Sequence, residues 1–138
     1  MRAIVIVPDS KSGTLERREV PEPEPGPREV LIRVKATALN RADLAQRRGG
    51  YPAQRTAGDS GLVIGGLEAA GEIVGMGSEV TGCATGDRVM AMCSGGYADY
   101  VTVDYRLALP VPQPLSWEEA ATIPVAYMTE HDALITNA

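Results

Sequence analysis

The side chains able to bind a metal or act as nucleophiles are few and widely separated in this sequence. Cys83 and Cys93 stand ten positions apart, and His131 is the single histidine. That set is too small for the usual cysteine and histidine zinc sites. A serine nucleophile would need His131 as its base, and the sequence has no G-x-S-x-G turn to expose such a serine. His131 stands between Glu130 and Asp132, which favours a surface or packing role.

A glycine-rich stretch spans residues 65–89, and glycine-rich loops are where phosphate sites are sought. It contains neither G-x-G-x-x-G nor G-x-x-x-x-G-K-[ST], so it encodes no nucleotide phosphate cradle. Its apolar pieces, 69–70 and 73–74, are too short for separate helices. Because glycine tolerates positive φ and has no side chain, the stretch predicts strands that bend tightly and pass close to other backbone.

Composition indicates a soluble globular domain. The chain has 138 residues, of which 44% are hydrophobic and 22% charged, and the absence of phenylalanine predicts an aliphatic core. A net charge of −5 provides no basic surface for nucleic acid or an anionic membrane. No apolar run approaches the roughly 18 residues of a membrane span. With only two cysteines, we expect reduced thiols and a cytoplasmic protein.

Alternating and capped segments predict the elements that would position a site. Strands are expected at 3–7, 15–20, 30–36, 89–92 and 97–103. In the third strand, Ile32 and Val34 face one side and Arg33 the other, which is typical of a half-buried strand. Residues 21–27 carry four prolines and predict an extended surface connector.

Helices are predicted at two places. A short helix runs from Asn40 to about residue 48, because asparagine is a favoured N-cap and Asp43 suits the first turn. The S-x-x-E capping box at residues 116–119 starts another helix, which Pro124 interrupts before a second piece at 125–135. The polar residues 51–61 form an irregular loop of the kind on which function tends to sit.

Several segments together carry a family resemblance. Residues 66–74 (GLEAAGEIV), followed by Gly77, Val80 and 86–89 (GDRV), closely resemble the G-x-E-x-x-G-x-V…G…V…G-D-x-V pattern of the medium-chain dehydrogenase/reductase family. In this chain Ile73 and Val74 share the valine position. Residues 25–34, 96–101 and 124–129 look like further segments of that family, so the resemblance covers essentially the whole chain. It implies a mainly β fold with a few short helices, a GroES-like partly open β-barrel.

Departures from the family pattern select a branch. Zinc-dependent members carry a cysteine where this chain has Asn40, a histidine where it has Leu67, and a cysteine or acidic ligand near Val125. None of these three side chains is a zinc ligand. Ala42 replaces the threonine or serine that relays protons in alcohol dehydrogenases, and without a Lewis acid simple alcohol oxidation is not expected. Residues 38–44 (ALNRADL) resemble the zinc-free NADPH quinone oxidoreductase group, with its enone and enoyl reductase relatives.

The resemblance implies hydride transfer from NADPH to a quinone or conjugated carbonyl, with no zinc. Substrate delocalisation lowers the barrier, so positioning and a hydrogen-bond donor can suffice. Asn40 and Tyr51 would be the catalytic residues, and Asn40, Arg41, Tyr51 and Thr129 would bind the cofactor. Asn40 would face the nicotinamide, and Tyr51 at the mouth of the site would hydrogen-bond the substrate or protonate an enolate.

Structural roles remain open for the same residues. Asn40 also suits a plain N-cap, Tyr51 a loop packing residue, and Asp43 a partner of the helix dipole. Glu68 is expected to be a buried carboxylate that must find hydrogen-bond donors.

The resemblance also implies a domain organisation. Residues 1–123 would form the GroES-like catalytic domain, and 124–138 a junction helix leading toward a Rossmann domain absent from these residues. The full enzyme is expected to be a homodimer, and these 138 residues alone are expected neither to bind NADPH tightly nor to turn over. Three alternatives remain: a non-catalytic GroES-like binding or assembly module, the enoyl reductase of a larger enzyme, and a divergent metal-dependent dehydrogenase.

Overall fold

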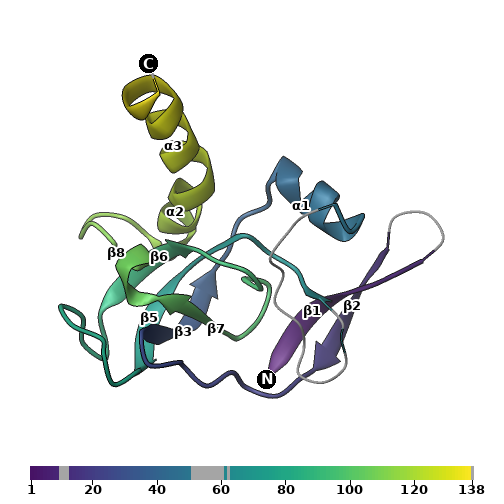
Figure 1. Cartoon of the computed structure of the whole chain (residues 1–138), viewed down its shortest axis with the longest axis horizontal. Helices are drawn as coiled ribbons and strands as arrows, with labels where there is room; N and C mark the ends of the chain where they lie inside the picture. The colour runs from purple at the N-terminus through teal and green to yellow at the C-terminus, as the bar shows by residue number, and fades with distance from the viewer. Residues whose placement is uncertain (10–12, 51–60, 62, 138) are drawn as a thin grey trace.

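The computed structural model describes residues 1–9, 13–50, 61 and 63–137, and it is mainly β (Figure 1). The strands are β1 (Arg2–Val7), β2 (Thr14–Glu19), β3 (Glu29–Ala36), β4 (Val63–Ile64), β5 (Glu68–Met76), β6 (Arg88–Met92), β7 (Tyr100–Asp104) and β8 (Leu109–Pro110). The helices are α1 (Arg41–Arg47), α2 (Trp117–Ala121) and α3 (Ile123–His131), with a 3₁₀ turn at Tyr105–Leu107 and a π-helical turn at Asp132–Thr136.

The strands form two antiparallel sheets. One has the order β2-β1-β4 and the other β7-β3-β5-β6-β8. Among the described residues both sheets are open, so their strands do not close into a barrel. The expected mainly β, GroES-like class with a few short helices is confirmed, in its open form.

Residues 97–99 tie the two sheets together. The Ile4 N–H donates to the Tyr97 carbonyl at 2.8 Å, and the Val34 N–H donates to the Asp99 carbonyl at 2.9 Å. The predicted strand at 97–103 begins only at Tyr100, because Ala98 forms a bridge with Ala3 of β1 and Asp99 bonds to both β1 and β3. This crossing places Tyr97 between the sheets, close to α1.

The glycine-rich stretch contains one long strand instead of several tightly bent ones. β5 spans nine residues. It pairs with β3 along most of its length, with register shifts at Leu31/Ile32 and Val34/Ala36, and with β6 over residues 68–72. Strand pairing holds its glycines in extended conformation, which the local sequence does not favour by itself. The predicted close backbone approach is confirmed at Gly71, where a Cβ atom would overlap the carbonyl oxygen of Arg33.

The core is aliphatic, as the composition predicts. The largest cluster comes from the five-stranded sheet and consists of Val30, Ile32, Ala69, Ile73, Val89, Ala91, Val101 and Val103. The predicted alternation of β3 is confirmed from Ile32 onward, where Arg33 and Lys35 are exposed, whereas Leu31 is buried like its neighbours on both sides.

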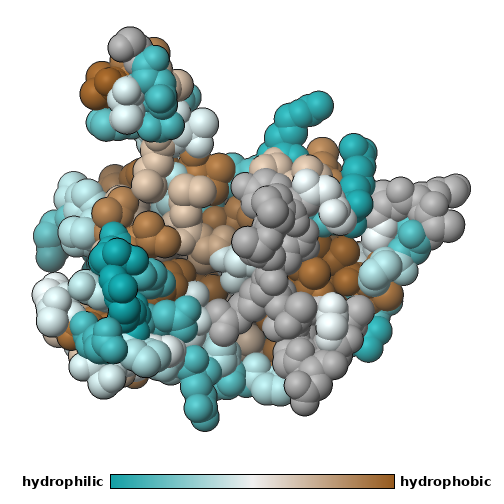
Figure 2. Space-filling model, in the orientation of Figure 1, coloured by the Kyte–Doolittle hydropathy of each residue, from teal (hydrophilic) through white to brown (hydrophobic). Residues whose placement is uncertain are grey.

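The C-terminal helices cover one end of the five-stranded sheet. Ser116 caps α2 through the predicted capping box, and Ala120 and Ala121 pack against Ala70 of β5. α2 ends just before Pro124, which is the second residue of α3. α3 then projects away from the sheets, and exposed hydrophobic side chains lie on it and on the π-helical turn that follows (Figures 1 and 2).

Candidate functional site

Glu68 is the centre of a buried polar network. It is the first residue of β5 and only 1% of its surface is exposed. Its Oε1 accepts a hydrogen bond from Asn40 Nδ2 at 2.6 Å, and its Oε2 accepts one from the Val125 N–H at 2.8 Å. A buried carboxylate needs donors on both oxygens, and these two partners supply them. The expectation that Glu68 is a buried carboxylate with donors is confirmed.

A second group of bonds holds the start of α1. Asn40 is the N-cap, and Asp43 Oδ2 accepts from the Asn40 N–H at 2.6 Å. The same Asp43 oxygen accepts from the Tyr97 hydroxyl at 2.8 Å. Asp43 Oδ1 is buried and has no hydrogen-bond partner among the described residues. Burial, together with this bond to Asp43, raises the pKa of the Tyr97 hydroxyl above its ordinary value of 10.0.

The buried face of α1 fixes the turn before β5. Gln46 is 1% exposed, and its Oε1 accepts from the Gly66 N–H at 3.0 Å. Gly66 has φ +99°, and a Cβ atom there would lie 2.6 Å from the Tyr97 ring. Only glycine fits this position, because it must adopt positive φ and lie under an aromatic ring. The restricted backbone of this turn therefore fixes the position of Glu68 next to Asn40.

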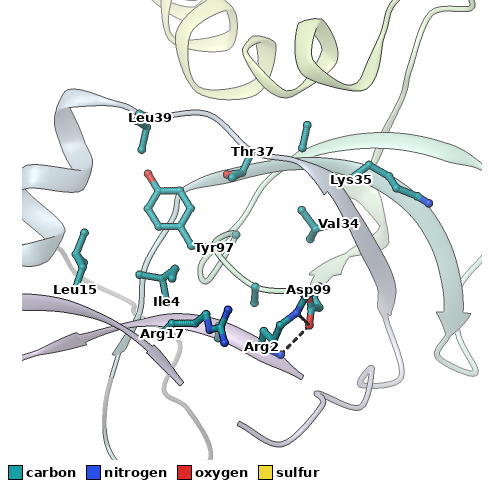
Figure 3. Close-up of a pocket in the computed structure, with 14 residues that line it drawn as sticks. Arg2, Ile4, Leu15, Arg17, Val34, Lys35, Thr37, Leu39, Tyr97 and Asp99 are labelled. Atoms are coloured by element: carbon teal, nitrogen blue, oxygen red, sulfur yellow. Dashed lines mark hydrogen bonds and ion pairs between the residues drawn. The ribbon is translucent and has the colours of Figure 1, made fainter. Parts of the chain in front are cut away.

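An open groove of about 630 Å³ lies beside this network, between β1 and the end of β3 (Figure 3). Tyr97 stands in the middle of it, with Ile4, Leu15 and Leu39 on its walls. The Tyr97 hydroxyl points toward Leu39 and away from Arg2 (Figure 3). Its proton is donated to Asp43.

An exposed ion pair closes one end of the groove. Arg2 Nη2 lies 2.9 Å from Asp99 Oδ1, and the backbone N–H of Arg2 donates to the other Asp99 oxygen at 2.7 Å. The guanidinium lowers the pKa of the Asp99 carboxyl, and Asp99 in turn raises the pKa of Arg2. The groove thus has apolar walls and a few polar groups at its ends, which is a common composition of small-molecule sites.

The structure brings together some of the predicted site residues. Asn40 is half-buried in the Glu68 network. Thr129 is exposed on α3, and its hydroxyl donates at 2.6 Å to the carbonyl of Val125, whose N–H binds Glu68. Arg41 is exposed, and its guanidinium makes no hydrogen bond or ion pair within the described part of the chain. Tyr51 lies outside the described residues.

The three positions that the resemblance assigns to zinc ligands also meet here. Asn40 and Val125 both bind Glu68, and the buried Leu67 directly precedes it. Within the ranges that the structure describes, no three His, Cys, Asp or Glu side chains gather as metal ligands. His131 is exposed on α3, and Cys83 and Cys93 are not joined by a disulfide. In the part of the chain that is described, no helix is long and apolar enough to cross a membrane.

Sequence reasoning missed the links of Tyr97 and Gln46 to the site. Tyr97 belongs to a predicted strand and to the family-like segment 96–101, but nothing in its sequence neighbourhood predicts a bond to a residue 54 positions earlier. The signal for Gln46 was a polar residue on the inner face of a short helix, which by itself is ambiguous.

Comparison with known proteins assigns the family. Residues 26–113 match the alcohol dehydrogenase GroES-like domain, and the chain belongs to that family. The resemblance to medium-chain dehydrogenases/reductases is thereby confirmed, and the described fold is that of their GroES-like domain.

Oxidoreductases are found among both the curated and the solved relatives. The chain is 39% identical over 133 residues to the trans-enoyl reductase tazE of Aspergillus terreus, covering 83% of this chain and 41% of that protein. It aligns with a mycobacterial protein solved in complex with NADPH at a TM-score of 0.86 and 30% identity, covering 99% of this chain and 42% of the other. The quinone oxidoreductase of Thermus thermophilus, also solved with NADPH, aligns with a TM-score of 0.76 and 36% identity, covering 97% and 40%. The chain thus spans about two fifths of the length of these relatives.

Proposed function

We propose that this chain is the catalytic-domain portion of a zinc-independent, NADPH-dependent oxidoreductase that reduces quinones or conjugated enones by hydride transfer. Residues 1–123 form its GroES-like catalytic domain, and residues 124–138 form the junction helix. The observation that carries the proposal is the arrangement around Glu68. Where a zinc site would have its ligands, an amide, a leucine and a valine surround a buried carboxylate.

The donor set of this chain fits the cofactor. NADPH supplies the hydride when bound. Arg41 offers an exposed guanidinium without a competing carboxylate, which suits a phosphate group. Asn40 offers an amide whose direction is set by Glu68, and the Thr129 hydroxyl oxygen can still accept a hydrogen bond after donating to the helix. Two solved relatives that share this fold bind NADPH, which supports the same cofactor here.

Substrate chemistry follows from what these residues can do. Leu67 and Val125 have hydrocarbon side chains and cannot polarise an alcohol oxygen. A conjugated acceptor needs only to be held near the nicotinamide and to receive a hydrogen bond as charge develops on its oxygen. We assign that donor role to Asn40 and to Tyr51.

The test uses the protein at its native length, with NADPH oxidation followed by absorbance. We expect reduction of a para-quinone and of a conjugated enone, no oxidation of simple alcohols with NADP⁺, and no change after chelation or added zinc. Alcohol oxidation that disappears on chelation would show instead a divergent metal-dependent dehydrogenase. No NADPH binding at native length, measured by calorimetry, would favour a non-catalytic binding module.

A substitution tests the proposed role of Arg41 in binding NADPH. Arg41→Ala should raise KM for NADPH by about tenfold, roughly the value of one charge-assisted contact. Arg48→Ala, an exposed arginine at the other end of α1, is the matched control and should leave KM unchanged.

A second candidate is the enoyl reductase of a larger enzyme, favoured by the identity to a trans-enoyl reductase. The two are separated by substrate preference. A kcat/KM for an enoyl thioester that exceeds the value for quinones by tenfold or more would select the enoyl reductase.

A further inference from the structure

The two oxygens of Glu68 are divided between two helices that are far apart in the sequence. Oε1 holds the side chain of the residue that caps α1, and Oε2 holds a backbone N–H in the first turn of α3. The partners lie 28 and 57 residues from Glu68. Because Glu68 is 1% exposed, bulk water does not reach the carboxylate to replace either donor.

Each donor depends on Glu68 for a definite reason. Val125 is the third residue of α3, and an N–H in the first turn of a helix has no carbonyl partner within that helix. Pro124, just before it, has no N–H to offer. The negative charge of Glu68 also suits the positive end of the helix dipole. Asn40 has its own N–H engaged by Asp43, so its side-chain amide is the group that Glu68 can orient.

We propose that Glu68 is a positioning residue that couples α3 to the Asn40 amide. A displacement of α3 moves the carboxylate through Oε2, and the carboxylate then turns or releases Asn40 through Oε1. The effect of this coupling on catalysis rests on the proposed function, because the coupling would influence hydride transfer through Asn40. The hydrogen-bond link itself stands independently of that function.

Exchanging one oxygen for an NH₂ group separates the two contacts. In Glu68→Gln, the single remaining oxygen can accept from Val125 only if the new NH₂ faces Asn40. Asn40 must then rotate its amide to present Oδ1. If the oxygen accepts from Asn40 instead, the NH₂ opposes the Val125 N–H and the contact with α3 is lost. Either way the wild-type orientation cannot be kept.

A paired exchange restores the link. In the double variant Glu68→Gln/Asn40→Asp, the new amide at position 68 donates to the new carboxylate at position 40. Its oxygen still accepts from Val125. The pair keeps its total charge and both contacts, with the donor and the acceptor exchanged. A role of Glu68 in packing alone predicts no such recovery.

The experiment measures kinetics and hydrogen exchange on the native-length protein. Glu68→Gln should lower kcat by about 10- to 100-fold, with a smaller change in KM, because a misoriented group costs most in the transition state. In an Asn40→Ala background the same change should cause no further loss of kcat. Glu72→Gln, at a half-buried glutamate on the same strand that pairs with Arg33 and Lys35 instead of Asn40, is the matched control and should retain wild-type kcat.

Residue-resolved hydrogen exchange measures the two hydrogen bonds of Glu68 directly and does not require enzymatic activity. Glu68→Gln is one test variant, and Glu68→Asp, whose side chain is one methylene too short to reach both donors, is the other. In each variant we expect faster exchange of the Val125 amide or faster exchange of the Asn40 side-chain amide. The double variant should restore Val125 protection to within about threefold of wild type. If Glu68→Gln unfolds by circular dichroism, Glu68→Asp replaces it in both measurements.

The outcomes distinguish the two proposals. Absence of reductase activity in the wild type contradicts the proposed function, and the exchange data still decide the coupling. Equal losses of kcat from Glu68→Gln in the wild-type and Asn40→Ala backgrounds overturn the coupling, as does unchanged exchange at both Val125 and Asn40.

Discussion

Replacing Tyr97 with phenylalanine tests the bond between the groove and the start of α1. The Tyr97 hydroxyl donates to Asp43 Oδ2 at 2.8 Å, and that carboxylate already has one buried oxygen without a partner in the described chain. Tyr97→Phe keeps the ring over Gly66 and removes only the hydroxyl. A hydrogen bond to a charged group contributes about 1.5–3 kcal/mol, so we expect a loss of that size near neutral pH.

The stabilisation by the Tyr97 hydroxyl should decrease at high pH. Burial, and then the bond to Asp43, raises the pKa of Tyr97 in the folded protein above its ordinary 10.0. Above that ordinary value the unfolded chain has released the phenolic proton while the folded chain still holds it. The folded state then binds more protons, and its stability falls as pH rises, by up to about 1.4 kcal/mol per pH unit. The contribution of the hydroxyl is therefore complete below about pH 10 and decreases above it.

Urea unfolding of both proteins, followed by circular dichroism at about pH 8 and about pH 11, measures the effect. We expect the stability difference between wild type and Tyr97→Phe to shrink between these conditions, by no more than about 1.4 kcal/mol because solvent reaches part of the ring. Tyr127→Phe, at an exposed tyrosine on α3, is the control and should change stability little at either pH. A difference for Tyr97→Phe that is equal at both values would refute the reasoning.

The other predictions concern how the elements are held. Gly71→Ala should destabilise the protein by about 3 kcal/mol or more, since the added Cβ overlaps a carbonyl oxygen of the neighbouring strand. The control is Gly50→Ala, whose Cβ would lie 3.5 Å from its nearest neighbour. It should change stability by less than about 1 kcal/mol in the same urea assay. Ser116→Ala should cost about 1 kcal/mol of unfolding free energy by removing the cap of α2, and no change would show that this helix is held by packing alone. Arg88→Lys should lower the melting temperature, because the guanidinium lies 4.4 Å from the centre of the Trp117 ring and also donates to a backbone carbonyl; an unchanged melting temperature would contradict this role.

The candidate site was only partly predictable from the sequence. Asn40 as the start of a helix follows from its own type and from Asp43 three residues later. A buried Glu68 that needs hydrogen-bond donors is also among the expectations. Neither pattern indicates that the two side chains meet, or that Val125 completes the group. Those contacts depend on where β5 and α3 lie relative to α1, which local sequence does not encode.

The local elements of this protein are determined by its sequence, and their assembly is decided by the tertiary structure. The alternation of β3 and the capping box of α2 act over a few residues, so neighbouring side chains are enough to specify them. The continuity of β5 has another origin, because its glycines lower strand propensity and only pairing with β3 and β6 keeps it extended. The buried carboxylate of Glu68 likewise becomes stable only when donors from distant segments arrive together.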